Sequence, residues 1–445
     1  MNSEMFIALP AKKLFVQCVV PAVITAVFGA LYSVIDGIFV GRFLGENALA
    51  AVNLIMPVIM IVEAISNMIA TGASVNISLL LGRQEREAAS RVFSFSVKFI
   101  LVFSCVVSVL GFFFAEPFIR LIAPGANGEA IRLSAEYLKV FAMFGPLVPV
   151  YFAMDNFLRV CGKPRLSMII NISTQVINVG LNFVLIVLLH QGVRAAAAAS
   201  CISIVLGSVV TLLLFTGKRM DVFYVRGGVP WPQFFRIIAN GSSEFFTSIA
   251  TSVMSVIMNL FLLHYGGTTA VAAFSIVMYV DSVIGMITFE ISDSLQPAIS
   301  YCYGAKATER LKELFRIILT VTAVLSAGVF LLMFLAGPHL AALFVKPGDT
   351  ALLEMSVTAV KIFAFSYLVG WIDMCVSSLF TALDRPGRSL LAAVFGTLVF
   401  PVAFLFILTA LWGLNGVWLM AAVSGAASAA LTLILARPLR KDLNI

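Results

Sequence analysis

The chain has 445 residues, of which 61% are hydrophobic and only 11% are charged, and its mean hydropathy is +1.05. A soluble globular chain is about 45–50% apolar and about 25% charged. A water-soluble domain of this length cannot hide so much apolar surface, which excludes secreted, fibrous, disordered and nucleic-acid-binding classes. The composition therefore indicates a polytopic membrane protein, and the net charge of +7 then reflects cytoplasmic loops.

The apolar runs are long and continuous, so they predict membrane helices and not the short alternating strands of a barrel. A span needs about 20 apolar residues, and this length accommodates about twelve helices with their loops. We expect helices at 13–40, 48–80, 90–115, 131–159, 166–190, 194–217, 233–264, 270–302, 311–336, 352–383, 388–412 and 415–436. The predicted fold class is an all-α polytopic membrane protein with twelve transmembrane helices.

Lysine and arginine are distributed unevenly between the two sides of these spans. With the N-terminus inside, the inner segments hold 21 of these residues and the outer segments hold 5. Because cytoplasmic loops carry the excess of positive charge, both termini are predicted to be cytoplasmic. The six cysteines lie in apolar runs without a CxxC motif, so we expect buried free thiols at Cys18, Cys105, Cys161, Cys201, Cys302 and Cys375.

The two halves of the sequence resemble each other. An offset of 222 residues aligns 45–87 with 267–309 without a gap, and 12 of the 43 aligned positions are identical. The same offset pairs Lys163-Pro164 with Arg385-Pro386 in a later loop. This pattern predicts two parallel six-helix repeats, an N-terminal lobe (1–217) and a C-terminal lobe (233–445), joined by a cytoplasmic linker (218–232). Such repeats are typical of transporters that work by alternating access around a central site.

Acidic residues within the predicted spans are the main candidates for function. A lone charge in the bilayer costs about 2.5–3.5 kcal/mol on insertion scales, so we expect these acids to face a water-filled cavity and some to bind H⁺, Na⁺ or cationic substrates. Lys98, Lys139 and Lys361 are too few to neutralise them. For Asp155, with Arg159 one turn away, a solvated helix end is the simpler interpretation, and it stays open for Glu63 and Glu244. The acids are Asp36, Glu63, Asp155, Glu244, Asp281, Glu290, Asp293 and Asp373.

One group of these polar residues is predicted to lie at a common depth. Asp36 lies about six residues inside the outer end of the first helix, which is about 9 Å. Asn178 and Asn182 are four residues apart, hence on one helix face, and Asn182 lies at a similar depth. An Asp beside two amides predicts a buried protonation site. Pro21 interrupts the hydrogen bonding of the first helix and offers a bend beside this site, although a kink used only for packing is the alternative.

No motif of an enzyme or an ATP-driven motor is present. The sequence contains no GxxxxGK[ST], no HExxH and no GxSxG, and the three histidines are too scattered to form a metal triad. We therefore expect no enzymatic activity, no cofactor and no structural metal, and an intramembrane enzyme is the weak alternative.

Several segments together resemble the multidrug and toxic compound extrusion (MATE) transporters, in their MepA-like branch. The first half carries Asp36-Gly37-Ile38-Phe39-Val40-Gly41-Arg42-Phe43-Leu44-Gly45, followed by Ala48-Leu49-Ala50-Ala51. The second half carries Gln296-Pro297-Ala298-Ile299-Ser300-Tyr301-Cys302-Tyr303-Gly304-Ala305-Lys306, and Phe157-Leu158-Arg159 with Gly162 and Pro164 is similar to a further family segment. The resemblance covers nearly the whole chain.

The resemblance implies two six-helix lobes in a V shape and export of amphipathic, often cationic compounds in exchange for H⁺ or Na⁺. It matches Pro21, Asp36 and Asn178 to a cation site in the N-terminal lobe, with Na⁺ as the alternative ion at Asp36 or Asp373. Asn182 departs from the family, because several relatives carry an aspartate there. The protein would act as a monomer in the cytoplasmic membrane, with small molecules and lipids as its partners and no nucleic acid.

In the C-terminal lobe the resemblance is less complete. Asp373 matches the acid of the tenth helix, whereas Glu244 lies nearer the start of its helix than the family's glutamate. Asp281, Glu290 or Asp293 are the alternatives to Glu244. A flippase of lipid-linked glycans is the other transport function that this architecture allows, but it needs central lysines or arginines to hold pyrophosphate. A receptor or scaffold without transport is a third possibility.

Overall fold

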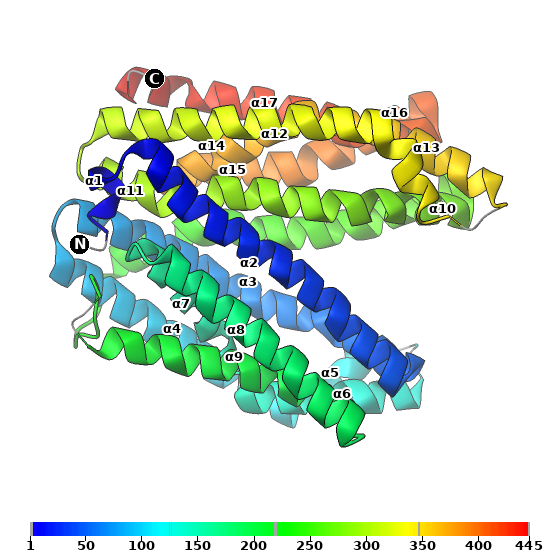
Figure 1. Cartoon of the computed structure of the whole chain (residues 1–445), viewed down its shortest axis with the longest axis horizontal. Coiled ribbons are helices and arrows are strands. Elements are labelled where there is room, and N and C mark those ends of the chain that lie inside the picture. The colour runs from blue at the N-terminus through cyan, green and yellow to red at the C-terminus, as the bar shows by residue number, and fades with distance from the viewer. Residues whose placement is uncertain (1–2, 124, 126, 218–219, 346–347, 444–445) are drawn as a thin grey trace. The chain divides into compact units, whose positions relative to one another are not determined.

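The computed structural model describes residues 3–123, 125, 127–217, 220–345 and 348–443. The described chain is built from helices, most of them long enough to cross a membrane (Figure 1). It divides into two compact units, Met1–Leu9 with Val16–Gly241 (unit 1) and Pro10–Phe15 with Ser242–Ile445 (unit 2). The lobes predicted at 1–217 and 233–445 stay a prediction, and Lys218 and Arg219 of the predicted linker lie outside the described residues.

The α-helices of the first part of the chain are α1 (Met5–Ala8), α2 (Ala11–Phe39), α3 (Glu46–Gly82), α4 (Arg86–Phe113), α5 (Ala115–Ile122), α6 (Gly128–Phe144), α7 (Val148–Val160), α8 (Pro164–Asn182) and α9 (Val193–Thr216). Those of the second part are α10 (Trp231–Asp293), α11 (Gln296–Gly304), α12 (Thr308–Ala342), α13 (Thr350–Ala364), α14 (Gly370–Ala382), α15 (Pro386–Val394), α16 (Phe400–Trp412) and α17 (Leu414–Leu443). Shorter segments are the π-helical η1 (Val40–Leu44), η2 (Phe183–Leu188) and η4 (Phe395–Val399), and the 3₁₀ turn η3 (Phe365–Leu368).

The number of spans agrees with the sequence. Within the described residues, ten helical runs are long and apolar enough to cross a membrane, and the pair α6 and α7, bent by 51°, makes an eleventh. The run Trp231–Gly304 has 74 residues and is broken at Gly267, whose φ of 65° favours glycine. It therefore supplies two spans, those predicted at 233–264 and 270–302, and the all-α membrane class with twelve spans is confirmed.

A turn at Ser294–Leu295, between α10 and α11, interrupts the helix expected at 270–302, and two further predicted helices are interrupted. The helix expected at 131–159 bends at Gly145–Leu147, where Pro146 and Pro149 cannot donate backbone hydrogen bonds. The helix expected at 352–383 is divided by the 3₁₀ turn η3. In both cases the apolar run is continuous, which is why hydropathy alone predicted one straight helix.

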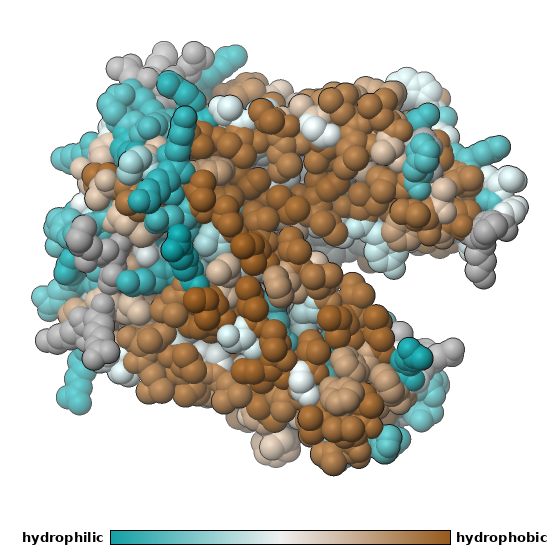
Figure 2. All heavy atoms as spheres, viewed as in Figure 1, coloured by the Kyte–Doolittle hydropathy of each residue, from teal (hydrophilic) through white to brown (hydrophobic). Residues whose placement is uncertain are grey.

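Each unit has its own apolar core. In unit 1, Ile55, Ala115 and Ile119 are fully buried where α3, α5 and α6 pack together. In unit 2, Leu262, Met333 and Trp418 form the centre of a second core. Hydrophobic residues cover the middle of the helices and hydrophilic residues gather at their ends (Figure 2), which is the pattern expected of spans whose side chains meet lipid.

Unit 1 also contains a crossing of two backbones without side chains between them. A Cβ atom added to Gly72 of α3 would overlap the carbonyl oxygen of Ile237 in α10, and one added to Gly241 would overlap the carbonyl oxygen of Met68. Small residues permit such close approach of membrane helices. The first turns of α10 are thus held directly against α3.

The prediction for the cysteines is correct for five of them and wrong for one. Cys18, Cys161, Cys201, Cys302 and Cys375 are buried free thiols. Cys105 is exposed, because it lies on the outward face of α4 between Ser104, which is buried, and the exposed Val106.

Candidate functional site

Asp36 and two asparagines meet in unit 1. The amide nitrogen Nδ2 of Asn182 donates to Asp36 Oδ1 at 2.7 Å and to Asn178 Oδ1 at 2.8 Å. Asp36 comes from α2 and both asparagines come from one face of α8, as their spacing of four predicts. The structure therefore brings together the three residues that the sequence grouped by depth. We call them the Asp36 cluster.

The cluster continues into α9 through residues that the sequence analysis missed. Asn178 Nδ2 donates to Ser200 Oγ at 3.1 Å and to Ser203 Oγ at 3.4 Å. The two serines are three residues apart, so they share a helix face, and this spacing was the available signal. Asn178 and Asn182 are only 2% and 0% exposed, and Asn182 Oδ1 has no hydrogen-bond partner among the described residues. One acceptor of the cluster is thus free to receive a donor.

Pro21 lies on the same helix as Asp36 but not beside it. The two residues are fifteen positions apart, which is about four turns or about 22 Å along α2. The carbonyl of Pro21 accepts a hydrogen bond from Thr25 Oγ1 at 2.9 Å. The expectation of a bend next to the acid is therefore corrected: any bend at Pro21 acts on Asp36 from a distance.

In unit 2 three of the predicted acids line one cavity. Glu244, Asp293 and Asp373 surround a space of about 200 Å³, together with hydroxyl and apolar side chains from α10, α14 and α15. Glu290 is not among the lining residues. Asp281 lies elsewhere in the unit, where its Oδ1 accepts from the hydroxyl of Tyr367 at 2.7 Å. Of the three alternatives to Glu244, Asp293 is the one that shares a cavity with Asp373.

Asp373 and Asp293 have different surroundings in this cavity. Asp293 Oδ1 accepts from Gln296 Nε2 at 3.2 Å. Asp373 Oδ1 is buried and has no hydrogen-bond partner among the described residues. A Cβ atom on Gly396 would lie 2.8 Å from Asp373 Oδ2, so the absence of a side chain there leaves room for the carboxylate. Asp293 therefore has a side-chain donor in this cavity, whereas Asp373 Oδ1 has none among the described residues.

The three π-helical segments described in the chain all border these polar groups. Segment η1 begins four residues after Asp36, η2 begins directly after Asn182, and η4 contains Gly396 beside Asp373. A π-helical turn weakens the regular hydrogen bonding of a helix and often occurs at functional sites. The π-helical segments therefore mark the same candidate functional positions as the polar side chains do.

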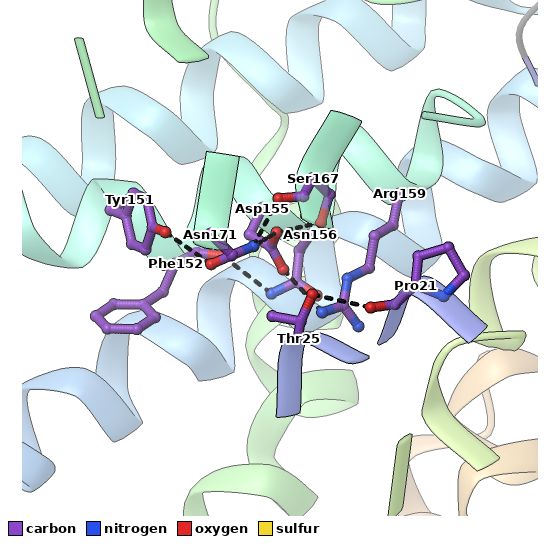
Figure 3. Close-up of polar contacts among 9 residues, drawn as sticks. All are labelled: Pro21, Thr25, Tyr151, Phe152, Asp155, Asn156, Arg159, Ser167 and Asn171. Atoms are coloured by element: carbon purple, nitrogen blue, oxygen red, sulfur yellow. Dashed lines mark hydrogen bonds and ion pairs between the residues drawn. The ribbon is translucent and has the colours of Figure 1, made fainter. Parts of the chain in front are cut away.

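Asp155 belongs to a separate network in unit 1 (Figure 3). Its Oδ1 accepts from the hydroxyl of Ser167 and from Asn171 Nδ2, the latter at 2.6 Å, and its Oδ2 lies 3.0 Å from Arg159 Nη2. The hydroxyl of Tyr151 donates to Asn171 Oδ1 at 2.7 Å. The side chains of Asp155 and Arg159 are only 16% and 14% exposed. The expected partner is present, but the acid is mostly buried and not at a solvated helix end, so its role is to fasten α7 to α8.

We expect Asp155→Ala to destabilise unit 1 by about 1–3 kcal/mol, because it removes the carboxylate that accepts from Ser167 and Asn171 and that faces Arg159 in a mostly buried place. Glu116→Ala is the matched control, since Glu116 and Arg120 form an exposed pair of the same spacing at 2.8 Å, worth about 1 kcal/mol or less. Detergent-solubilised protein is heated and the fraction that stays monodisperse is measured by size-exclusion chromatography. Equal loss from the two variants would show that the buried network has no special structural role.

Among the residues that the structure describes, no group of three or more His, Cys, Asp or Glu side chains could hold a metal ion. Lys98 and Lys139 are exposed on their helices, and neither they nor Lys361 lines the cavity of unit 2.

Comparison with known proteins agrees with the two-unit fold. A model of the MatE family matches residues 21–184 and 245–407, one segment in each half. The multidrug export protein MepA of Staphylococcus haemolyticus (strain JCSC1435) is 27% identical over 400 residues, which is 89% of this chain and 87% of the relative. MepA of Staphylococcus aureus (strain N315) is 29% identical over 392 residues, or 87% and 85% of the two chains.

Solved structures show the same fold. An outward-facing multidrug resistance MATE family transporter of the MOP superfamily matches with a TM-score of 0.88 and 23% identity, over 100% of this chain and 99% of that one. A MATE structure in the bent conformation matches with a TM-score of 0.91 and 22% identity, over 100% and 98%.

Two related halves of long apolar helices, each with half-buried acidic side chains within its spans, indicate a multi-pass membrane transporter. The chain belongs to the MatE family, and the two relatives named above are multidrug export proteins.

Proposed function

We propose that this protein is a secondary antiporter that exports amphipathic and cationic compounds in exchange for H⁺ or Na⁺ by alternating access. The observation that carries the proposal is Asp36, a membrane carboxylate held by the amide of Asn182 instead of by a cation. Within the described residues, no lysine, arginine or histidine lies within ion-pair distance of Asp36 or Asp373. An unpaired acid at membrane depth is costly when charged, so it favours binding of a proton, a metal cation or a cationic substrate.

Two sites of this kind, one in each unit, suit an exchange cycle. The Asp36 cluster offers one carboxylate and a free amide oxygen, which are ligands for a proton or for Na⁺. The cavity around Asp373 offers a carboxylate without a hydrogen-bond donor and space of about 200 Å³. We propose that Asp36 is the principal coupling residue, because Asn182 cannot titrate and leaves it the one acid of its cluster.

Helix α2 carries both Pro21 and Asp36. We propose that occupation of Asp36 by a cation changes the bend of α2 at Pro21 and thereby the space available to the exported compound. Both termini would lie in the cytoplasm, as the distribution of lysine and arginine indicates.

The names of the relatives suggest the substrates. MepA is a multidrug export protein, and soft apolar walls with a few acids suit recognition of varied cationic compounds. A flippase of lipid-linked glycans would require a basic site for pyrophosphate, whereas Lys98, Lys139 and Lys361 do not line the acidic cavity. The balance of charge favours cationic cargo.

The test is export of ethidium from proteoliposomes under an imposed pH difference and, separately, under an imposed Na⁺ gradient. We expect export under at least one gradient and none when both are collapsed, and the active gradient identifies the coupling ion. Liposomes without protein are the control. Absence of gradient-dependent export for a dozen chemically different cationic dyes would contradict the proposed antiport.

A further inference from the structure

Unit 1 contains a cavity at the point where a membrane helix begins. It has a volume of about 540 Å³, and residues of α1, α2 and the start of α8 line it. The span Pro164–Leu188 starts here. None of the lining residues belongs to the Asp36 cluster or to the Asp155 network. The volume falls within the range of about 300–1,000 Å³ that is typical of small-molecule sites.

The charged side chains that line this cavity are both basic. They are Lys163, which is half-buried, and Arg165, which is exposed, and no Asp or Glu is among the lining residues. Neither basic side chain forms an ion pair with another described residue. An anion in the cavity could therefore form charge-assisted hydrogen bonds with two side chains that have no other charged partner.

The acids of the neighbouring segments have partners of their own. Asp155 of α7 lies 3.0 Å from Arg159 (Figure 3). Glu4 and Asp221, which are next in sequence to two lining residues, lie 3.6 Å and 4.0 Å from Arg86. Because these three acids are engaged elsewhere, they leave the positive charge of the cavity uncompensated.

The start of α8 adds hydrogen-bond donors to the same wall. Lys163 is the N-cap residue, no side chain caps the helix, and no acid lies in its first turn. Pro164 has no N–H group, so the backbone N–H groups of Arg165 and Leu166 are the donors left at this end. Both residues line the cavity. Backbone donors at the start of a helix suit the oxygens of a phosphate.

The cavity is continuous with an apolar strip on α8. Ile169 lines the cavity, is 56% exposed and lies four residues after Arg165, hence on the same helix face. Val176, two turns further along this face, is 60% exposed. The face thus changes from basic to apolar within one turn, as at the boundary between lipid headgroups and hydrocarbon. A phosphate in the cavity can stay attached to acyl chains that lie along this strip.

We propose that this cavity binds the phosphate of an anionic membrane phospholipid, held by Lys163, Arg165 and the start of α8, with the acyl chains along Ile169 and Val176. The distribution of lysine and arginine predicts this end of α8 to be cytoplasmic, and anionic lipids of the cytoplasmic leaflet attract basic residues there. The site is separate from the acids proposed to couple ions, and lipid binding is measured without transport.

The experiment is native mass spectrometry of the full chain in detergent, titrated with phosphatidylglycerol or with phosphatidylcholine of the same acyl chains. We expect one phosphatidylglycerol to bind more tightly than the first phosphatidylcholine. Lys163→Gln together with Arg165→Gln should weaken phosphatidylglycerol binding about 25-fold, which is about fivefold for each charge beside an anionic lipid. The variant Lys163→Arg with Arg165→Lys keeps both charges and should bind as the wild type does.

Arg83→Gln together with Arg226→Gln is the matched control, because both arginines are exposed in unit 1 and do not line the cavity. This variant loses the same charge and should keep phosphatidylglycerol binding. If the double variant of the cavity does not fold, Lys163→Gln and Arg165→Gln decide singly, each with about a fivefold loss. Equal weakening in cavity and control variants, or no preference over phosphatidylcholine, would overturn the proposal. Competition by glycerol phosphate at the concentration of the lipid would overturn it in favour of a soluble phosphate compound.

Discussion

Replacing Asp36 by asparagine is expected to reduce gradient-driven export to the background of empty liposomes. The amide is nearly isosteric with the carboxylate and can still accept the hydrogen bond that Asn182 donates at 2.7 Å, so the fold should persist. What is lost is the one group of the cluster that can take up a proton or neutralise a cation. The measurement is initial ethidium export in proteoliposomes with equal amounts of inserted protein.

Two further variants make this result interpretable. Asp349→Asn changes an exposed acid that caps α13 by accepting from the backbone of Leu352, and asparagine caps helices equally well, so export should be unchanged. Asp373→Asn tests the cavity of unit 2. Export at the wild-type rate by Asp36→Asn, together with an inactive Asp373→Asn, would show that unit 2 carries the coupling ion and that the proposed role of Asp36 is wrong.

The second large effect is expected at the crossing of α3 and α10, in the variant Gly72→Ala. The added Cβ would overlap the carbonyl oxygen of Ile237, and a backbone atom cannot turn aside as a flexible side chain can. We expect destabilisation of roughly 3 kcal/mol or more, seen as loss of the monodisperse peak and of insertion in the membrane. Gly241→Ala should behave alike, because its Cβ would overlap the carbonyl oxygen of Met68.

Gly37 and Gly285 provide the matched controls for this prediction. Both lie within long helices and neither has a neighbouring atom within 4 Å of an added Cβ. Alanine at these positions should be tolerated, since it meets open space. If Gly72→Ala gives as much folded protein as Gly37→Ala, the two helices are not held at a fixed separation by that contact.

Much of the fold could be predicted because long apolar runs form membrane helices. Span positions depend on local hydropathy, so most boundaries, such as 166–190 against α8 and η2 (Pro164–Leu188), differ by only a few residues. The bend between α6 and α7 depends on prolines whose effect on a helix varies with its neighbours. The exposure of Cys105 depends on which face of α4 packs inward, which hydropathy does not report.

The candidate sites show the same distinction between local and long-range information. Helical spacing placed Asn178 beside Asn182, and depth placed Asp36 at the same level, so the cluster followed from simple geometry. The contacts of Ser200 with Asn178, and of Ser167 and Asn171 with Asp155, join different helices. Rotation of each helix about its axis decides such contacts, and hydropathy does not report it. For this reason Asp293 could not be distinguished from Asp281 and Glu290 in advance.

The distance between Pro21 and Asp36 makes the intervening part of α2 a lever arm. If the helix bends by about 10° at Pro21, a point about 22 Å further along is displaced by about 4 Å. The hydrogen bond between Asn182 and Asp36 is 2.7 Å long, and a hydrogen bond is lost once its atoms separate by more than about 3.5 Å. A small change of the bend at Pro21 is therefore enough to break the hydrogen bond between Asn182 and Asp36. A cation that binds both side chains would in turn hold α2 at one bend angle.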